Sequence, residues 1–316
     1  MHGLILFLLA ASCASLGGDH PRSIALTFDD LPVAPHSLTF NEAKRTTDKL
    51  LAALKPAGSP AVAFVNESKL EVPGETDRRL SLLRAWVDGG HELGNHTYSH
   101  PDLNTTPLLN FQSDILRGER LTRPMMRSAG KQLRWFRHPF THTGPTQQIK
   151  FNLELFLKRK GYRVAPFTIE NSDWLFSKVW LDAVHRGDQE TAARIKDAYL
   201  DFNDIMFGWF ERLSVETFSR DIPQVLLLHA NPLNAEVLPE MLARIRARGY
   251  RFVSLDEAMS DSVYETRDGY VGKEGPSYIH RWAVTRGLPN RLRDEPDPPA
   301  WVSQRSRAQD STAAAR

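Results

Sequence analysis

Carboxylates and imidazoles stand in this 316-residue sequence where short apolar runs end. Asp29 and Asp30 follow the run "SIALTF", and His96 and His100 form "HTYSH" after another run. Two adjacent carboxylates repel each other, so their placement indicates a partner of positive charge. Neutral imidazoles together with a carboxylate suit zinc or a similar divalent ion, with one open position left for water in a catalytic site. These residues therefore predict metal-dependent chemistry.

The two histidines are spaced i and i+4, which places both rings on one side of a helical turn. Pro101 disfavours helix at His100, so the turn is expected to be short. Two surface histidines are the simple alternative. A carboxylate arriving from another strand end favours the metal site.

Three further side chains follow apolar runs. His229 ends "LLLH", and at a strand end it is either a general acid or a hydrogen-bonded core residue. Arg137 in "RHPF" either holds a carboxylate or is simply exposed. Asp173 in "ENSDW" either binds a histidine N–H or caps a helix.

Seven apolar runs, rich in Val, Ile, Leu and Phe without clean alternation, predict buried parallel strands. They are "SIALTF", "AVAFVN", "HELGN", "LRWFR", "RVAPFTI", "QVLLLH" and "RFVSL". Between them lie amphipathic segments at 41–55, 75–87, 145–160 and 235–248. The regular alternation predicts an α/β fold, and seven units suggest a distorted (β/α)7-type barrel. Its strand ends would gather the polar residues named above.

The segment 175–221, before the last strands, is longer than a crossover needs. Its apolar residues between 192 and 213 recur with a helical period. It is either a long barrel helix or a helical insertion that shapes a substrate groove.

The two ends of the chain differ from the middle. Residues 1–20 contain "LILFLLAA" followed by small residues, which predicts a signal peptide and export to the periplasm, cell surface or medium. The single cysteine, Cys13, lies in this segment, but Ala10 stands where a lipoprotein signal has leucine, which argues against a lipid anchor. No stretch in the mature chain is apolar enough to span a membrane. Residues 263–316 read as a C-terminal extension, with a disordered tail over 290–316.

The sequence is similar to the polysaccharide deacetylases of carbohydrate esterase family 4, which share the NodB homology domain. The resemblance covers about residues 23–260, within a catalytic domain expected over 21–262, and five short motifs occur in the family's order: "TFDD", "HTYSH", "RHPF", "ENSDW" and "LLH". It implies a distorted barrel that removes acetyl groups from N-acetylated glycans with a divalent metal, zinc most often, cobalt or another ion otherwise. By position, Asp30, His96 and His100 would bind the metal, Asp29 would act as general base and His229 as general acid.

The remaining roles also come from the resemblance. Arg137 would orient the base, and Asp173 would orient the acid. The backbone N–H of Phe140 would stabilise the oxyanion. Trp174 and Leu227 would line the pocket for the acetyl methyl group.

The sequence departs from the family pattern at two places. Glu170 stands where the fourth motif usually has aspartate, and the second strand region reads "AFVN" where the family more often has "TFF". His138 and His142 are additional histidines, which we interpret as incidental loop residues. The long 175–221 segment makes transfer of a substrate by analogy unsafe.

Other functions stay open at this point. The substrate could be peptidoglycan, a chitin-like oligomer or an exopolysaccharide, or another acyl compound such as acetylxylan. The chain could also be an inactive carbohydrate-binding relative or a metal-free, ureide-cleaving one, but the complete Asp/His/His set argues against both. The net charge of +2 gives no case for nucleic acid as a partner.

Overall fold

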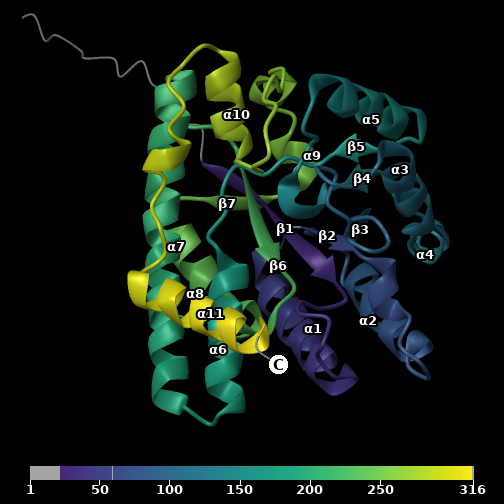
Figure 1. The fold of residues 1–316 in the computed structure, drawn as a ribbon, viewed down its shortest axis with the longest axis vertical. Helices are drawn as coiled ribbons and strands as arrows, with labels where there is room; N and C mark the ends of the chain where they lie inside the picture. The colour runs from purple at the N-terminus through teal and green to yellow at the C-terminus, as the bar shows by residue number, and fades with distance from the viewer. Residues whose placement is uncertain (1–21, 59, 315–316) are drawn as a thin grey trace, which may run out of the picture.

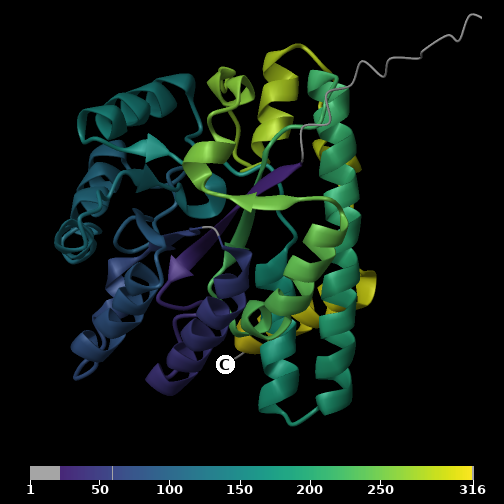
Figure 2. The same ribbon diagram turned by 180° about the vertical axis from the view of Figure 1, so that it is seen from behind.

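The computed structural model describes residues 22–58 and 60–314. A seven-stranded, wholly parallel sheet lies at the centre in the order β5-β4-β3-β2-β1-β6, with β7 also paired to β1 (Figure 1). The sheet curls, and helices cover its outer side (Figure 2). The predicted distorted (β/α)7 barrel is confirmed.

Each of the seven predicted runs contains a strand, because their apolar side chains are buried rather than alternating with polar ones. The strands are β1 Ser23–Leu31, β2 Val62–Val65, β3 Glu92–Asn95, β4 Trp135–Phe136, β5 Arg163–Val164, β6 Gln224–His229 and β7 Arg251–Val253.

Strand β1 is the centre of the sheet. It pairs with β6 from Ile24 to Asp29, with β2 from Thr27 onward, and with β7 over Ser23–Ala25. Every residue of β1 except Asp30 is buried. The register places Asp29 opposite His229, so two predicted site residues from distant parts of the chain become neighbours.

The barrel is nearly closed by an irregular segment rather than by a full strand pair. After β5 the chain reaches β6 through a single parallel bridge between Ile169 and Leu226. The N–H groups of Thr168 and Ile169 both donate to Val225 O, at 2.9 and 3.1 Å. The predicted run "RVAPFTI" thus divides into a two-residue strand and this bridge, because Pro166 cannot donate to a ladder.

The predicted helical segments are confirmed with small shifts of their ends. Helix α1 begins at a capping box, in which Thr39 and Glu42 exchange side-chain and backbone hydrogen bonds. The helices are α1 Phe40–Leu54, α2 Thr76–Asp88, α3 Leu108–Arg117, α4 Thr122–Ser128, α5 Gln147–Arg159, α6 Asp173–His185, α7 Gln189–Phe218, α8 Pro232–Ala247, α9 Leu255–Ala258, α10 Tyr278–Thr285 and α11 Ala300–Ala314.

The long segment 175–221 forms two helices, α6 and α7, which lie side by side along one flank of the barrel (Figures 1 and 2). Helix α7 also contacts α8 and α10. Its apolar side chains are buried at nearly every turn, as at Tyr199, Phe202 and Phe210. The sequence allowed either a long barrel helix or an insertion that shapes a substrate groove. The burial of these side chains favours the barrel helix.

The predicted disordered tail is wrong for residues 300–314, which form α11. Helix α11 packs against α6, and Val302 is fully buried. Helix α10 packs on α7 and buries Trp282. The charged and proline-rich sequence between the helices suggested disorder, whereas the apolar residues inside the two helices find a surface on the barrel. The extension thus belongs to the folded domain.

The predicted signal peptide lies outside the described residues, as does Cys13. Within the described ranges, no helix combines the length and the hydropathy that crossing a membrane requires.

We predict that Phe202→Ala lowers the free energy of unfolding by about 3–5 kcal/mol, because it opens a cavity where this ring packs on Phe176. Ile205, on the same helix, is 52% exposed, so Ile205→Ala is the matched control and changes stability by less than about 0.5 kcal/mol. Urea unfolding followed by circular dichroism measures both. Equal, small losses would show that α7 is not part of the core.

Candidate active site

A cavity of about 720 Å³ opens at the carboxyl ends of the strands. Eight of the ten predicted site residues line it, and Arg137 and Asp173 lie directly behind that lining. The eight are Asp29, Asp30, His96, His100, Phe140, Trp174, Leu227 and His229. The structure thus brings together side chains from five separate segments of the sequence.

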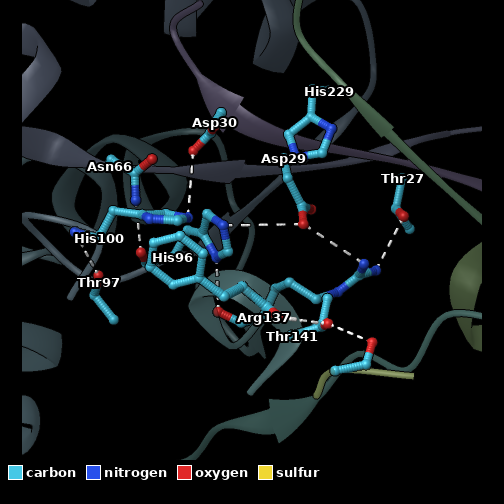
Figure 3. Close-up of polar contacts among 12 residues, drawn as sticks. Thr27, Asp29, Asp30, Asn66, His96, Thr97, His100, Arg137, Thr141 and His229 are labelled. Atoms are coloured by element: carbon cyan, nitrogen blue, oxygen red, sulfur yellow. Dashed lines mark hydrogen bonds and ion pairs between the residues drawn. The ribbon is translucent and has the colours of Figure 1, made fainter. Parts of the chain in front are cut away.

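The two aspartates of β1 differ in backbone conformation and in burial. Asp29 is the last residue in register with β6 and is 2% exposed. Asp30 has φ of 73°, a left-handed conformation that is costly for a residue other than glycine, and its side chain is half-buried. The backbone change turns the second carboxylate away from the first. Figure 3 shows Asp29 facing Arg137 and Asp30 facing His100.

The predicted helical turn at "HTYSH" is wrong. Residues 96–100 form an irregular turn, with φ of 67° at Thr97 and 59° at His100. Two hydrogen bonds hold this turn, from Thr97 N to Asn95 Oδ1 at 2.7 Å and from His100 N to Thr97 Oγ1 at 3.1 Å. The two imidazole rings still come together, with centroids 4.9 Å apart, so the turn achieves the expected proximity by a different geometry.

Asp30, His96 and His100 form a group whose candidate ligand atoms all lie within 4.8 Å of one another. His96 Nδ1 lies 2.7 Å from Arg137 O, a contact that needs the proton on Nδ1 and leaves the Nε2 lone pair free (Figure 3). Burial lowers the pKa of both histidines to about 4, so both rings are neutral near pH 7, as metal ligands must be. This donor set, two imidazoles and a carboxylate, fits a divalent metal.

The Asp30 carboxylate has electrostatic support from Lys69, whose Nζ lies 3.0 Å from Oδ1. Burial opposes its charge, but Lys69 and His100 outweigh burial and hold its pKa below the usual range. Asp30 Oδ1 nevertheless has no well-directed hydrogen bond among the described residues. A buried, charged oxygen without such a bond fits a ligand for a cation.

Asp29 lies between two potential partners without a short contact to either. Its Oδ2 is 3.7 Å from Arg137 Nη1 and 3.9 Å from His96 Nε2, and its Oδ1 has no hydrogen bond among the described residues. Arg137 is held by Thr27 Oγ1, which accepts from Nη2 at 3.0 Å. Burial raises the pKa of Asp29, while Arg137 acts against that rise. A carboxylate so placed can take up a proton, which is what a general base does.

His229 and Asp173 form a short, directed pair. His229 Nδ1 donates to Asp173 Oδ1 at 2.6 Å, and its backbone N–H donates to Oδ2 at 2.6 Å. Asn231 Nδ2 also donates to Oδ2, at 3.1 Å. Burial disfavours a charged His229, but Asp173 reverses this and raises the pKa of His229 to about 9. His229 is therefore protonated at neutral pH, unlike His96 and His100.

The predicted substrate-contacting residues lie on the cavity wall with different exposures. Phe140 and Trp174 are 52% and 56% exposed, and large apolar side chains so exposed suit contact with a sugar face. Leu227 is 6% exposed and lies at the cavity base beside the strand ends. Of the two additional histidines, His138 is buried outside the cavity lining, whereas His142 lines the cavity and lies 2.8 Å from Asp102.

Sequence reasoning missed one wall of the cavity. The C-terminal extension supplies Glu274–Ser277, Leu292 and Glu295, and Glu295 hydrogen-bonds to Glu170 of the fourth motif. Lys69 was also missed. No periodicity or motif marks these positions, because their proximity to the site arises only from the folding of the extension onto the barrel. No residue of α7 is among those lining the cavity.

The His229–Asp173 pair yields a test on the metal-free protein. We predict that Asp173→Asn lowers the pKa of His229 by about 1 to 3 pH units, because the neutral amide no longer opposes the cost of burial. A nuclear magnetic resonance titration of the His229 ring measures the change. Asp182→Asn, on the exposed side of the same helix, is the control and should leave the titration unchanged. An unaltered His229 titration in Asp173→Asn would contradict the assigned pairing.

Comparison with known proteins places this geometry in a family. Residues 17–155 match the family model described as polysaccharide deacetylase. The chain is 24% identical over 245 residues to a chitin deacetylase of Colletotrichum lindemuthianum, with 77% of this chain and 81% of that protein covered. It is 27% identical over 159 residues to a peptidoglycan-N-acetylglucosamine deacetylase of Bacillus cereus, covering 50% of this chain and about half, 48%, of that relative.

Among solved structures, the fold is similar to that of a carbohydrate esterase family 4 pseudoenzyme from Bacillus anthracis. The TM-score is 0.50 at 17% identity, and the alignment covers 76% of this chain and 66% of that one. Identity at this level supports the fold alone. Taken with the motif order, the family match and the curated relatives support the assignment of this chain to the polysaccharide deacetylases of carbohydrate esterase family 4.

Proposed function

We propose that this protein is a metal-dependent hydrolase that removes acetyl groups from N-acetylated glycans and releases acetate. The observation that carries the proposal is the meeting of three units in one cavity: the Asp30/His96/His100 group, the buried carboxylate of Asp29, and the protonated His229. Each unit has an ordinary structural explanation alone. Their convergence from separate strands on a single cavity does not.

The metal would be held by Asp30, His96 and His100. A divalent ion there lowers the pKa of a water molecule and polarises an acyl oxygen, with zinc the ion best suited to two imidazoles and one carboxylate. Neutral rings and a deprotonated Asp30 are already the states that binding requires, so binding releases few protons.

Asp29 would accept the proton of the attacking water. Its Oδ1 makes no hydrogen bond among the described residues, so one oxygen is available for this task. Arg137 would hold the carboxylate in place through its charge, with Nη1 3.7 Å from Oδ2, and leaves Oδ1 unoccupied. Burial raises the pKa of Asp29, and so its proton affinity, while the charge of Arg137 acts against that rise.

His229 would protonate the departing amine. Its Nδ1 is engaged by Asp173, so the proton available to the cavity is on Nε2. The N–H of Phe140, a residue with left-handed backbone angles in the segment Pro139–Thr141, would donate to the developing oxyanion. Leu227 would contact the acetyl methyl group, and Trp174 would cover the sugar.

The cavity lining favours a sugar without an anionic substituent. Asp29, Asp30, Glu170, Glu274 and Glu295 line it, and within the described ranges neither lysine nor arginine does. On the wall that the C-terminal extension forms, an acidic group on the substrate would meet Glu274 and the hydrogen-bonded Glu170–Glu295 pair, with no lysine or arginine of the described residues beside them in the lining. The protonated His229 and the metal would balance Asp29 and Asp30 at the strand ends. N-acetylglucosamine units, as in chitin-like oligomers, fit better than N-acetylmuramic acid.

Two alternative activities have less support. An inactive carbohydrate-binding relative would not need His229 protonated, Asp29 buried and three ligand residues together. An O-acyl substrate such as acetylxylan would fit the same machinery, but an alkoxide leaves more readily than an unprotonated amide anion, so ester cleavage would need the His229–Asp173 pair less. We also propose export of the protein, on the composition of residues 1–20.

Metal binding and acetate release together test the assignment of the metal ligands and of the base. The purified protein should bind about one divalent ion per chain, as measured by elemental analysis. Asp29→Asn should keep the ion and lose at least about a hundredfold in acetate release, because the amide cannot accept a proton. His96→Ala should lose both the ion and the activity. A fully active Asp29→Asn variant, or activity that persists unchanged after chelation, would overturn the mechanism.

The charge of the cavity wall predicts a preference between two N-acetylated sugars. Acetate release from N-acetylglucosamine oligomers should exceed that from N-acetylmuramic residues of matched length by about tenfold or more, equivalent to about 1.4 kcal/mol. Glu274→Gln should narrow this ratio, because it removes a carboxylate from the cavity wall that the C-terminal extension forms. Glu240→Gln, on the exposed face of α8, is the matched control. Equal rates on both sugars in the wild-type protein would reject the charge argument.

A further inference from the structure

The loop that carries Phe140 is held in a conformation that its own sequence does not favour. Phe140 and Thr141 have φ of 54° and 56°, and both are non-glycine residues. Each left-handed residue of this kind costs on the order of 1 kcal/mol and persists only where surrounding contacts impose it. Loop 139–143 therefore needs an external support.

That support is Arg281 of helix α10, in the C-terminal extension. Its Nη2 donates to Thr141 O at 2.8 Å, and its Nη1 donates to Thr143 Oγ1 at 2.8 Å. Its Nε donates to Pro276 O at 2.8 Å, so one guanidinium joins the loop to the segment that forms the cavity wall. The guanidinium presents five N–H donors in a rigid plane, so it can join separate acceptors on the loop and the cavity wall in a fixed geometry, whereas a lysine ammonium is a single point on a flexible stem.

Arg281 is fully buried, which makes it costly unless its charge is balanced. Asp268 Oδ2 lies 3.3 Å from its Nη1 and 2.6 Å from Lys150 Nζ. The rings of Tyr270 and Tyr278 lie 5.2 and 5.0 Å from the guanidinium carbon. Lys150 belongs to the same network, but its contacts are to Asp268 and Tyr270, not to loop 139–143.

The extension presses on the loop at a second point. Thr141 Oγ1 lies 2.7 Å from Gly275 O, a contact drawn in Figure 3. A Cβ added to Gly275 would lie 1.9 Å from Thr141 Oγ1 and 2.4 Å from Phe140 O. The φ of Gly275 is not positive, so glycine is needed here for the close approach and not for its backbone freedom.

We propose that Arg281 and Gly275 are positioning residues, and that the C-terminal extension is a working part of the active site that holds loop 139–143. They act through the backbone of the loop, fixing the direction of the Phe140 N–H, and touch no reacting atom. The catalytic consequence rests on the function proposed above, whereas the positioning of the loop does not. The last of the five family motifs ends at His229, before the extension begins at residue 263, so no motif marks Gly275 or Arg281.

The structural arm of the test is hydrogen–deuterium exchange of the peptide that covers residues 139–146. Arg281→Ala should raise amide exchange in this peptide at least about tenfold, because two of the bonds that order the loop are lost. Lys150→Met disturbs the same buried network without touching the loop, so it is the matched control and should leave this peptide protected. Equal exchange in the two variants would overturn the proposal.

The catalytic arm measures acetate release from an N-acetylglucosamine oligomer. Arg281→Ala should lose at least about tenfold in kcat with KM changed less than about threefold, because the oxyanion donor acts in the transition state. Added guanidinium ion, at concentrations that leave the wild-type protein folded, should restore part of kcat. Gly275→Ala should lower kcat as well, through an independent displacement of the loop, while Lys150→Met keeps it.

The outcomes separate the two proposals. If the wild-type protein releases no acetate from any acetylated glycan, the proposed function fails, and the exchange experiment still tests the loop. If Arg281→Ala and Gly275→Ala keep wild-type kcat in an active enzyme, or if they change KM alone, the positioning role is wrong.

Discussion

The parallel pairing of β1 with β6 is the constraint on which the site depends. Parallel strands present their carboxyl ends at one edge, and this register sets Asp29 directly opposite His229. A shift by one residue would turn Asp29 to the other face and exchange it with Asp30 or Phe28. Because β1 is buried along its length, the apolar packing of Ile24, Leu26 and Phe28 holds that register firmly. The packing of the core thus sets the positions of Asp29 and His229.

Burial then assigns different protonation states to similar side chains. His96, His100 and His229 all lose water, which disfavours their charged forms. Only His229 has a carboxylate hydrogen-bonded to it, and Asp173 is in turn held by the backbone of β6 and by Asn231. The two aspartates also differ through their neighbours. Lys69 contacts Asp30 at 3.0 Å, whereas Arg137 faces Asp29 from 3.7 Å. Equal residue types therefore take separate roles through their neighbours.

The helices outside the barrel contribute unequally to the cavity. Helix α7 is long and buried, and it supports α6, whose first residues are Asp173 and Trp174. The extension, which reads as a peripheral tail, instead forms a wall of the cavity and supports the Phe140 loop. Distance along the chain from the motifs is thus a poor guide to distance from the site.

The strands, most helices and ten candidate site residues could be predicted from the amino-acid sequence, because hydrophobic periodicity and short motifs are local properties of the chain and the order of the motifs carries the family resemblance. The sequence also indicated that Asp29 and Asp30 are not equivalent, through the resemblance. The conformation of "HTYSH" could not be predicted in this way, because left-handed Thr97 and His100 replace the expected helical turn. Only the tertiary structure showed Lys69 beside Asp30, Glu295 beside Glu170 and Arg281 beneath the Phe140 loop. These contacts join residues that are far apart in sequence, so no local pattern encodes them, and they form only when the barrel and its extension pack together.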